Sequence, residues 1–147
     1  MPTIATDPKA LAATFNQAFN AHDEKTLSSL IAPNATFTAP GDIRLEGKEA
    51  VLAYISGWLK AFPDAKINVT HEIVSGPWVV QEFIFEGTHT APLTGPMGTI
   101  QATHRKVAGR SASINRYEND LGVETRLYFD MVQLLSQLGA MPVPAKN

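Results

Sequence analysis

Cysteine is absent from this sequence of 147 residues. The fold therefore cannot depend on disulfide bonds, and no thiolate is present to bind a metal ion. No uninterrupted apolar run reaches the ~20 residues that a membrane-spanning helix requires, and residues 1–13 contain no apolar stretch behind a basic start. We therefore expect a cytoplasmic protein without a membrane partner.

The sequence also lacks an excess of charge of either sign. Its 12 Lys and Arg residues against 14 Asp and Glu residues give a formal net charge of -2. Nucleic acids are bound largely through positive charge, so we expect no nucleic-acid partner. The densest basic group is interpreted as solvated surface and consists of Arg105, Lys106, Arg110 and Arg116.

Common catalytic and cofactor motifs are missing as well. The sequence contains no G-x-S-x-G nucleophile elbow, no Walker or dinucleotide-binding fingerprint and no H-E-x-x-H zinc motif. The glycine-containing segment GPMG at 95–98 has no lysine at phosphate-loop spacing, so it is interpreted as a turn. We therefore expect neither a cofactor nor a metal site.

Apolar residues make up 44% of the chain and charged residues 18%, which is typical of a globular protein, and the length suits one domain over residues 1–147. Helical spacing of apolar residues predicts four helices. The first begins at Pro8 behind a capping Asp7, the second is short and ends before Pro33, and the longest covers residues 48–62. The apolar face of the last helix consists of Met131, Leu134, Leu135 and Leu138.

A period of two between apolar residues predicts strands in the rest of the chain. The segment 78–85 is almost continuously apolar, which predicts a central strand covered on both faces. Residues 88–97 are expected to form a loop, and residues 118–120 a hairpin turn. Helices followed by hairpin-linked strands predict an α+β fold, with an antiparallel sheet and helices gathered on one face. The predicted strands are residues 35–39, 67–73, 78–85, 99–107, 111–117 and 123–129.

Several short stretches resemble the SnoaL-like polyketide cyclases and their ester-cyclase-like relatives. They are GWLKAF at 57–62, GPWV at 76–79, GTH at 87–89, YFD at 128–130 and QLG at 137–139. The stretches fall on elements already predicted from periodicity, so the resemblance covers nearly the whole chain. It implies a cone-shaped α+β barrel, in which a curved antiparallel sheet wraps around a pocket capped by N-terminal helices, usually in a homodimer.

The resemblance implies a catalytic role for Asp130. In the family's cyclases, the aspartate at the end of the last strand is the general acid/base of an intramolecular aldol ring closure. Burial at the floor of a dry pocket would make this carboxylate a stronger base. The alternative is that Asp130 caps the final helix, which starts at Met131, and the two roles are compatible.

Strand alternation places Tyr128 and Arg126 on the same face as Asp130. If this face lines the pocket, Tyr128 can donate a hydrogen bond to an oxyanion, and Arg126 can bind a substrate carboxylate or enolate. The alternative for Arg126 is a surface ion pair with Glu124 or Glu118.

His89 shares strand parity with Phe83 and Phe85, so we expect it at the pocket mouth. The resemblance supports a catalytic or substrate-binding role there, and a structural role is the alternative. Ser113 stands where the cyclases carry a histidine on the penultimate strand. A hydroxyl can bind substrate but does not titrate near neutrality, which argues against the same anthracycline-type cyclisation.

We expect a dry, aromatic pocket that binds a small hydrophobic molecule, because aromatic side chains fall on the predicted core faces of several elements. The apolar character of both faces of residues 78–85 also predicts a homodimer formed through the outer sheet face. The predicted lining residues are Phe15, Phe19, Trp58, Phe83, Phe85 and Tyr128.

Three functions remain open from the sequence. The first is a cofactor-independent enzyme in which Asp130 transfers protons on a small hydrophobic carbonyl compound, by aldol cyclisation, isomerisation or lyase chemistry. The second is a non-catalytic binder of a hydrophobic small molecule. The third is a hydrolase that resembles limonene epoxide hydrolase. It requires a second pocket carboxylate, for which the candidates are Asp42, Glu82 and Glu86.

Overall fold

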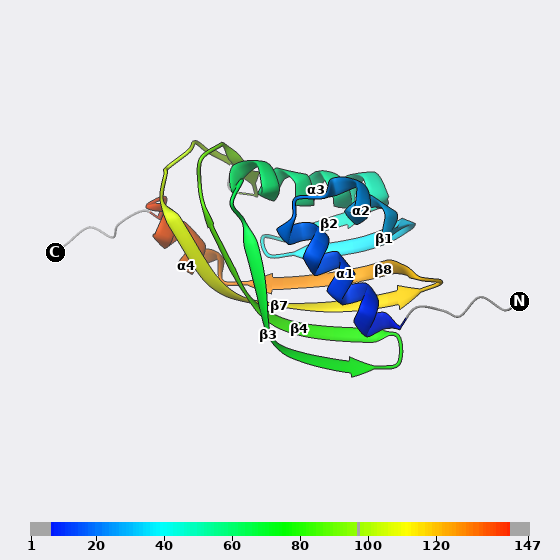
Figure 1. The fold of residues 1–147 in the computed structure, drawn as a ribbon. Helices are drawn as coiled ribbons and strands as arrows, with labels where there is room; N and C mark the ends of the chain where they lie inside the picture. The colour runs from blue at the N-terminus through cyan, green and yellow to red at the C-terminus, as the bar shows by residue number, and fades with distance from the viewer. Residues whose placement is uncertain (1–6, 97, 142–147) are drawn as a thin grey trace, which may run out of the picture.

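The computed structural model describes residues 7–96 and 98–141. Its elements follow the predicted order along the chain (Figure 1). They are α1 (Pro8–Asn20), α2 (Glu24–Ser29), β1 (Ile31–Ala39), β2 (Ile43–Glu46), α3 (Lys48–Ala61), β3 (Lys66–Ser75), β4 (Trp78–Thr88), β5 (Leu93–Gly95), β6 (Gly98–Ile100), β7 (Lys106–Glu118), β8 (Leu121–Phe129) and α4 (Met131–Leu138).

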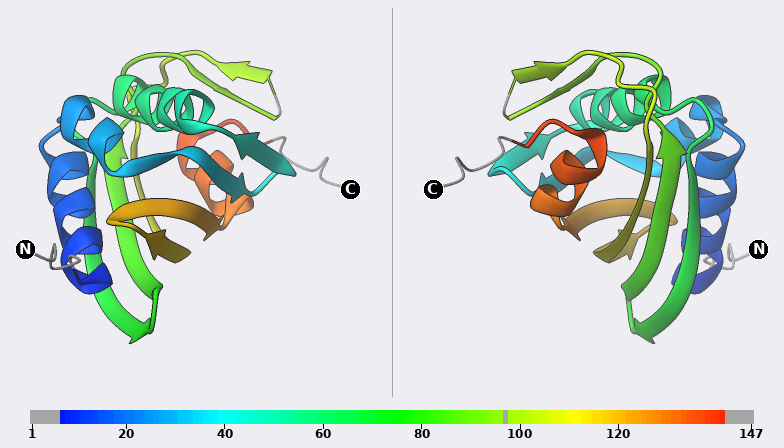
Figure 2. Two further views of the ribbon diagram at one scale, coloured as in Figure 1. Left: turned by 90° about the vertical axis from the view of Figure 1, so that its right-hand side faces the viewer. Right: turned by 90° about the vertical axis from the view of Figure 1, so that its left-hand side faces the viewer.

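The main sheet has six strands in the order β2-β1-β8-β7-β4-β3. β1 and β8 run parallel, whereas the other neighbouring pairs are antiparallel. The sheet is curved, and α1, α2 and α3 lie against its concave face (Figure 1, Figure 2). The predicted α+β fold, with a curved sheet capped by N-terminal helices, is confirmed, but the sheet is not antiparallel throughout as predicted, because β1 and β8 are parallel.

Aspartates begin three of these helices. Asp7, Asp23 and Asp130 precede α1, α2 and α4, and each accepts a hydrogen bond from a backbone N–H of the first turn, at 3.1, 3.1 and 2.9 Å. Such a cap satisfies an N–H that the helix leaves unpaired and contributes about 1 kcal/mol. At its other end α4 stops at Gly139, whose φ of 72° is a left-handed conformation that glycine adopts without strain.

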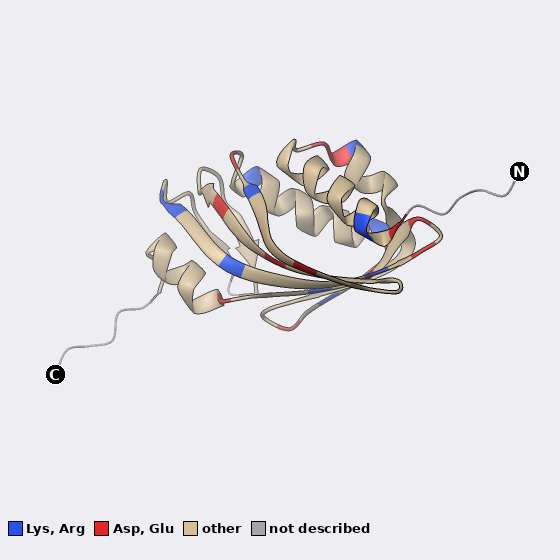
Figure 3. Ribbon diagram, turned by 60° about the horizontal axis from the view of Figure 1, so that its bottom comes forward, with Lys and Arg blue, Asp and Glu red and all other residues tan. Residues whose placement is uncertain are grey.

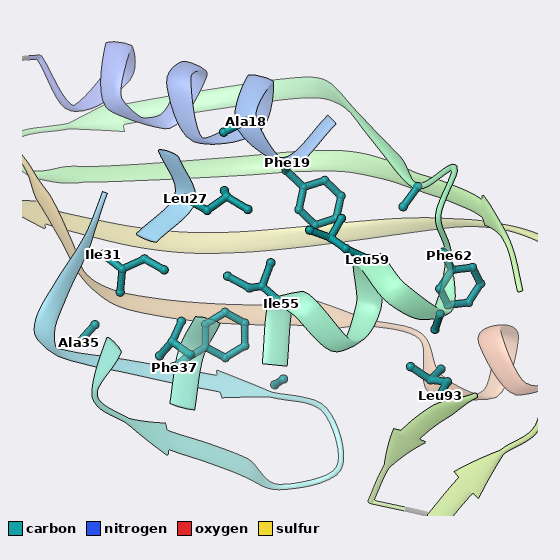
Figure 4. Packing of buried hydrophobic residues seen from close by; sticks show 14 of the residues in the cluster. Ala18, Phe19, Leu27, Ile31, Ala35, Phe37, Ile55, Leu59, Phe62 and Leu93 are labelled. Atoms are coloured by element: carbon teal, nitrogen blue, oxygen red, sulfur yellow. The ribbon is translucent and has the colours of Figure 1, made fainter. Parts of the chain in front are cut away.

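The core lies between these helices and the concave face of the sheet. Figure 4 shows side chains from α1, α2, α3 and β1 gathered there, including Phe19, Leu27 and Phe37. Leu27 and Phe62 are fully buried. Burying one such side chain contributes about 1.5–3 kcal/mol to folding, so this cluster fixes the helices on the sheet.

α4 lies beside the part of β7 that extends beyond the end of β8. The register of β7 with β8 stops at the pair Ser111 and Phe129, while β7 itself begins at Lys106. Gln137 of α4 pairs with this free edge. Its Oε1 accepts a hydrogen bond from the Ala108 N–H, and its Nε2 donates one to the Ala108 carbonyl, both at 2.9 Å. The end of β8 therefore lies at an open edge, which we call the rim, between the sheet and α4.

Several predicted boundaries are wrong, and the short strands β2 and β5 were not predicted. β1 begins at Ile31 and contains Pro33, which the sequence suggested as the end of α2. Pro33 lies before the first residue that pairs with β2 and within a register irregularity against β8, so its missing N–H costs no ladder hydrogen bond. Residues 98–100 pair with β5 in a separate hairpin, and β7 runs without a break through Gly109.

β4 lies inside the sheet, between β3 and β7, as the sequence predicted. Gln81 and Phe83 on its concave face are buried. Trp78, Val80 and Ile84 point to the convex face and are only half-buried, because the three N-terminal helices lie on the concave side. The expectation that β4 is covered on both faces is therefore wrong for the single chain. Charged residues of both signs also occur along the strands (Figure 3).

Candidate functional site: an aromatic cavity with a charged rim

A cavity of about 180 Å³ lies between the concave sheet face and helices α1, α3 and α4. Trp58 of α3 is at the centre of its aromatic wall, with ring centroids 5.6 Å from Phe85 and 5.7 Å from Phe129. Both contacts are edge-to-face, an arrangement favoured by the ring quadrupoles. Five of the predicted aromatic residues line the cavity. They are Phe15, Phe19, Trp58, Phe83 and Phe85.

A row of neutral polar side chains on β7 forms part of the floor. Ser111 and Ser113 line the cavity and are 6% and 8% exposed. Asn115 Nδ2 donates to Ser113 Oγ at 2.9 Å, and Asn115 Oδ1 accepts from Thr125 Oγ1 at 3.1 Å. These groups can hold substrate hydroxyl or carbonyl oxygens in an otherwise apolar cavity.

The row continues to Tyr117 at the end of the cavity nearer α1. Burial, with a contribution from the negative charge of Glu72, raises the pKa of Tyr117 to about 12. Glu72 accepts a hydrogen bond from Gln81 Nε2 at 2.7 Å, and Gln81 Oε1 accepts one from Asn16 Nδ2 at 3.1 Å. Tyr117 therefore stays a neutral phenol at physiological pH and serves as a hydrogen-bond donor rather than a base.

Asp130 lies at the opposite end of the cavity, where β8 meets α4. Its Oδ1 accepts a hydrogen bond from the Gln133 N–H at 2.9 Å, so the side chain caps α4. The side chain contributes to the cavity lining, but the residue is exposed. The expectation of a buried carboxylate at the cavity floor is wrong, because the chain turns into α4 directly after β8 and leaves Asp130 on the rim.

Tyr128 and Arg126 lie outside the cavity. Tyr128 is 54% exposed, and Arg126 Nε donates to Glu124 Oε2 at 2.8 Å. Leu127 and Phe129 face the cavity instead. Strand alternation correctly predicts that Tyr128 and Arg126 share a face. The expectation that this face is the inner one is wrong, since the other residues of β8 contribute the apolar lining.

Residues 9–138 match the family model described as SnoaL-like polyketide cyclase. The chain belongs to this family. The cone fold implied by the sequence motifs is therefore supported both by a family match and by the structure.

Solved structures of SnoaL-like folds are similar over most of the chain. IdmH of Streptomyces antibioticus, a proposed polyketide cyclase, is 26% identical, with a TM-score of 0.76 over 91% of this chain and 99% of that one. AclR of Streptomyces galilaeus, a proposed hydroxylase, is 24% identical, with a TM-score of 0.78 over 92% of this chain and 97% of that one.

An M. tuberculosis epoxide hydrolase of the LEH-like type is 13% identical, with a TM-score of 0.70 over 91% of this chain and 90% of that one. No curated protein matches the sequence. Because proteins on this fold carry different activities, the activity of this SnoaL-like chain must be argued from its site.

His89 is fully buried and does not line the cavity. Its Nδ1 accepts a hydrogen bond from the Thr103 N–H at 3.2 Å and lies 3.0 Å from Thr103 Oγ1, while its ring lies 5.3 Å from that of Phe62. The neutral ring therefore carries its proton on Nε2, which has no hydrogen-bond partner among the described residues. The expectation that His89 stands at the pocket mouth is wrong, because it packs behind Phe62.

Burial lowers the pKa of His89 from the ordinary 6.5. As pH falls below 6.5, the unfolded chain gains a proton that the folded chain does not accept, so stability should fall by up to about 1.4 kcal/mol per pH unit. Urea unfolding at pH 7 and pH 5.5 measures this loss. The loss should be smaller in His89→Gln than in the wild type, because the substitution removes the buried ring. An equal loss in the wild type and in His89→Gln would contradict the role of His89.

The carboxylates suggested for an epoxide hydrolase do not line the cavity of this SnoaL-like chain, and Asp42 is an exposed partner of Arg44. Among the described lining residues, the acidic ones are Glu124 and Asp130. Glu124 forms ion pairs with Arg126 and Arg116, at 2.8 and 3.5 Å. Glu124 and Asp130 are six positions apart along the strand, so their carboxylates are roughly 20 Å apart. This distance is too great for the two carboxylates to activate one water molecule together.

Within residues 7–96 and 98–141, no three His, Asp or Glu side chains come together as a metal site would require. None of the described helices is long and apolar enough to cross a membrane.

Proposed function

We propose that this SnoaL-like protein is a cofactor-independent acid/base enzyme that acts on a flat, hydrophobic carbonyl compound. The observation that carries the proposal is the position of Asp130 at the rim of an aromatic cavity, with Oδ1 capping α4. This leaves Oδ2 to accept a proton, since an ionised carboxylate has acceptor sites on both oxygens.

In the proposed reaction the apolar body of the substrate lies against Trp58 and Phe85, and its oxygens bind the polar row on β7. Asp130 removes a proton from the carbon beside a carbonyl. The enolate then attacks a second carbonyl of the same molecule in an aldol cyclisation, or is reprotonated at another position in an isomerisation. A substrate that covers the rim excludes water, and loss of water makes a carboxylate a stronger base.

A non-catalytic binder is the second candidate. Ser111, Ser113 and Asn115 are neutral, Tyr117 stays protonated, and the carboxylate of Glu124 is held in ion pairs with Arg126 and Arg116. Such a lining binds hydroxyl and carbonyl oxygens without transferring protons. Both candidates take the same kind of ligand and differ in whether its C–H protons exchange.

Exchange with solvent deuterium separates the two candidates. The probes are 2-tetralone and ethyl 2-oxocyclohexanecarboxylate, each incubated with the protein in D₂O and followed by proton NMR. An enzyme should exchange the protons beside the carbonyl faster than buffer alone. Binding of 2-tetralone without acceleration would support the binder and overturn the enzyme.

We also propose a homodimer formed through the convex sheet face. Ile73 of β3 pairs with Val80 of β4, and Val80 pairs with Ile114 of β7, so apolar residues cross three neighbouring strands. Ile73 is 66% exposed in the single chain. A second copy packed on this row would cover it and so remove an exposed apolar patch.

Ile73→Lys should convert the dimer to monomer, because a charge on the covered row must lose its hydration on association. Light scattering at micromolar concentration measures the molar mass. Val132→Lys is the matched control, since Val132 on α4 is 61% exposed but lies off this face. A monomeric wild type, or a dimer unaffected by Ile73→Lys, would contradict the interface.

A further inference from the structure

The register of β7 and β8 brings a second charged residue to Asp130. The last pair of the ladder is Ser111 with Phe129, so the next positions along the two strands are Arg110 and Asp130. Asp130 keeps an extended backbone, with φ of -84° and ψ of 101°, so the strand geometry continues to this residue. Opposite residues in an antiparallel pair have Cβ atoms about 4.5–5.5 Å apart.

Arg110 also reaches the cavity. By strand parity it belongs to the convex face, because it pairs with Ile84 of β4. β8 has already ended at this level, so the rim is open there, and both Arg110 and Asp130 contribute to the cavity lining. Arg110 is the single Lys or Arg among the described residues that line the cavity.

The other two arginines of β7 and β8 are occupied. Arg116 and Arg126 both pair with Glu124, at 3.5 and 2.8 Å. For Arg110 no ion pair or side-chain hydrogen bond occurs within the described part of the chain, so its guanidinium remains available to a ligand.

We infer that Arg110 binds the substrate oxygen on which negative charge develops when Asp130 removes a proton. The inference rests on the proposed function, and it names the residue that stabilises the enolate oxygen while Asp130 acts as the base. The C–H proton goes to the Asp130 carboxylate, the C–H electron pair becomes the C=C bond of the enolate, and the carbonyl π electrons move to the oxygen beside Arg110. In an isomerisation Asp130 returns the proton to carbon and the charge is neutralised. In ring closure the new C–C bond moves the charge to the oxygen of the attacked carbonyl, which takes the proton from Asp130. No oxidant or reductant is involved.

This placement also limits the substrate class. Away from the rim the cavity offers neutral donors and acceptors and one carboxylate, Glu124, which is already paired with Arg126 and Arg116, whereas positive charge is available at the rim. The enolisable carbonyl, or a carboxylate attached beside it, must therefore lie at the rim, with the uncharged body of the molecule directed inward. A flat aromatic ketone or keto acid has this distribution, and a ligand with its charge at the buried end does not.

Arginine variants test the inference by the exchange of 2-tetralone protons in D₂O. Arg110→Gln should lower the exchange rate by at least tenfold, because a donor aimed at the developing oxyanion is lost, and Arg110→Lys should restore part of the rate. Arg126→Gln is the matched control and should exchange at the wild-type rate, since Arg126 does not line the cavity.

The exchange assay distinguishes the two claims. If Asp130→Asn exchanges at the wild-type rate, the proposed function fails. If Asp130→Asn loses exchange while Arg110→Gln keeps it, Asp130 remains the base and the role of Arg110 is overturned.

A binding assay tests the same position without turnover. The probes are 2-naphthoate and its neutral methyl ester, titrated by fluorescence into the intact protein. Arg110→Gln should weaken binding of 2-naphthoate by about fivefold to tenfold and leave the ester unchanged, because a rim charge pair is worth on the order of 1 kcal/mol. An unchanged ratio of the two affinities, or no binding of either probe to the wild type, would overturn the inference.

Discussion

Replacing Asp130 by asparagine should lower turnover by about a hundredfold or more, the range expected when general acid/base catalysis is lost. Asparagine keeps the size of the side chain and can still accept the Gln133 N–H, but it cannot take a proton from carbon. Affinity for 2-tetralone should change little, because the aromatic wall is untouched. Solvent-deuterium exchange measures the rate, and fluorescence competition measures the affinity.

The folding effect of this substitution should be small, since asparagine caps helices about as well as aspartate. Asp23→Asn is the matched control. Asp23 caps α2 through the Thr26 N–H at 3.1 Å and does not line the cavity, so its variant should keep full turnover. Asp130→Ala should lose the cap as well, at a cost of about 1 kcal/mol in the free energy of unfolding.

Full turnover in Asp130→Asn would remove the acid/base assignment. The sequence offered His89 as the next residue to test, but this residue is buried behind Phe62 and does not reach the cavity. With the other candidate base absent from the cavity, that result would favour the binder.

Periodicity was sufficient for most of the fold and for the aromatic wall. The apolar stripe predicted over residues 48–62 lies on α3, and Trp58 of this helix lines the cavity. Phe83 and Phe85 follow from the alternation in β4. These predictions succeed because burial of large apolar side chains determines which side of an element faces the core.

Alternation could not identify the inner face of β8. Both faces of this strand carry large side chains, with Leu127 and Phe129 on one face and Tyr128 on the other. Alternation therefore shows which residues share a face, but not which of the two faces points into the cavity. Asp130 shows a related limit. Its backbone is still extended as in β8, but its exposure depends on where α4 packs, which the strand pattern does not show.

The position of Arg110 at the rim of the cavity could not be predicted from the sequence, because it depends on a β-bulge. The hairpin turn at Asn119 and Asp120 starts a register that, continued without interruption, would place Gly109 opposite Asp130. The shift between Arg116 and Tyr117 moves every later pair by one residue and brings Arg110 there instead. The turn can be predicted from the sequence, whereas the bulge depends on packing across the sheet. The interpretation of the basic group as solvated surface agrees with the exposure of Arg110, but it does not show that this residue lies at the rim of the cavity.

Ser113→Trp should abolish ligand binding by filling the cavity. Ser113 lies on the floor between Gln81 of β4 and Leu127 of β8, and it is 8% exposed. An indole at this position projects from the floor into the cavity that the ligand would use. Affinity for methyl 2-naphthoate should fall by at least tenfold, because a bulky side chain takes the place of the ligand against the aromatic wall.

Stability has to be measured beside binding, since overpacking a core costs typically about 1–3 kcal/mol. Urea unfolding and circular dichroism establish that Ser113→Trp is folded before its affinity is interpreted. Ala112→Trp is the matched control, because Ala112 is the neighbouring residue of β7, points to the convex face and does not line the cavity. It should bind the ester as the wild type does.

Both the enzyme and the binder require the ligand to enter this cavity, so the experiment tests their common premise. Loss of binding in Ser113→Trp together with full binding in Ala112→Trp would place the ester on the concave side of β7. Wild-type affinity in a folded Ser113→Trp protein would mean that the ester binds elsewhere. The roles proposed for Asp130 and Arg110 would then lose their basis, because each depends on a substrate held against the concave face of the sheet.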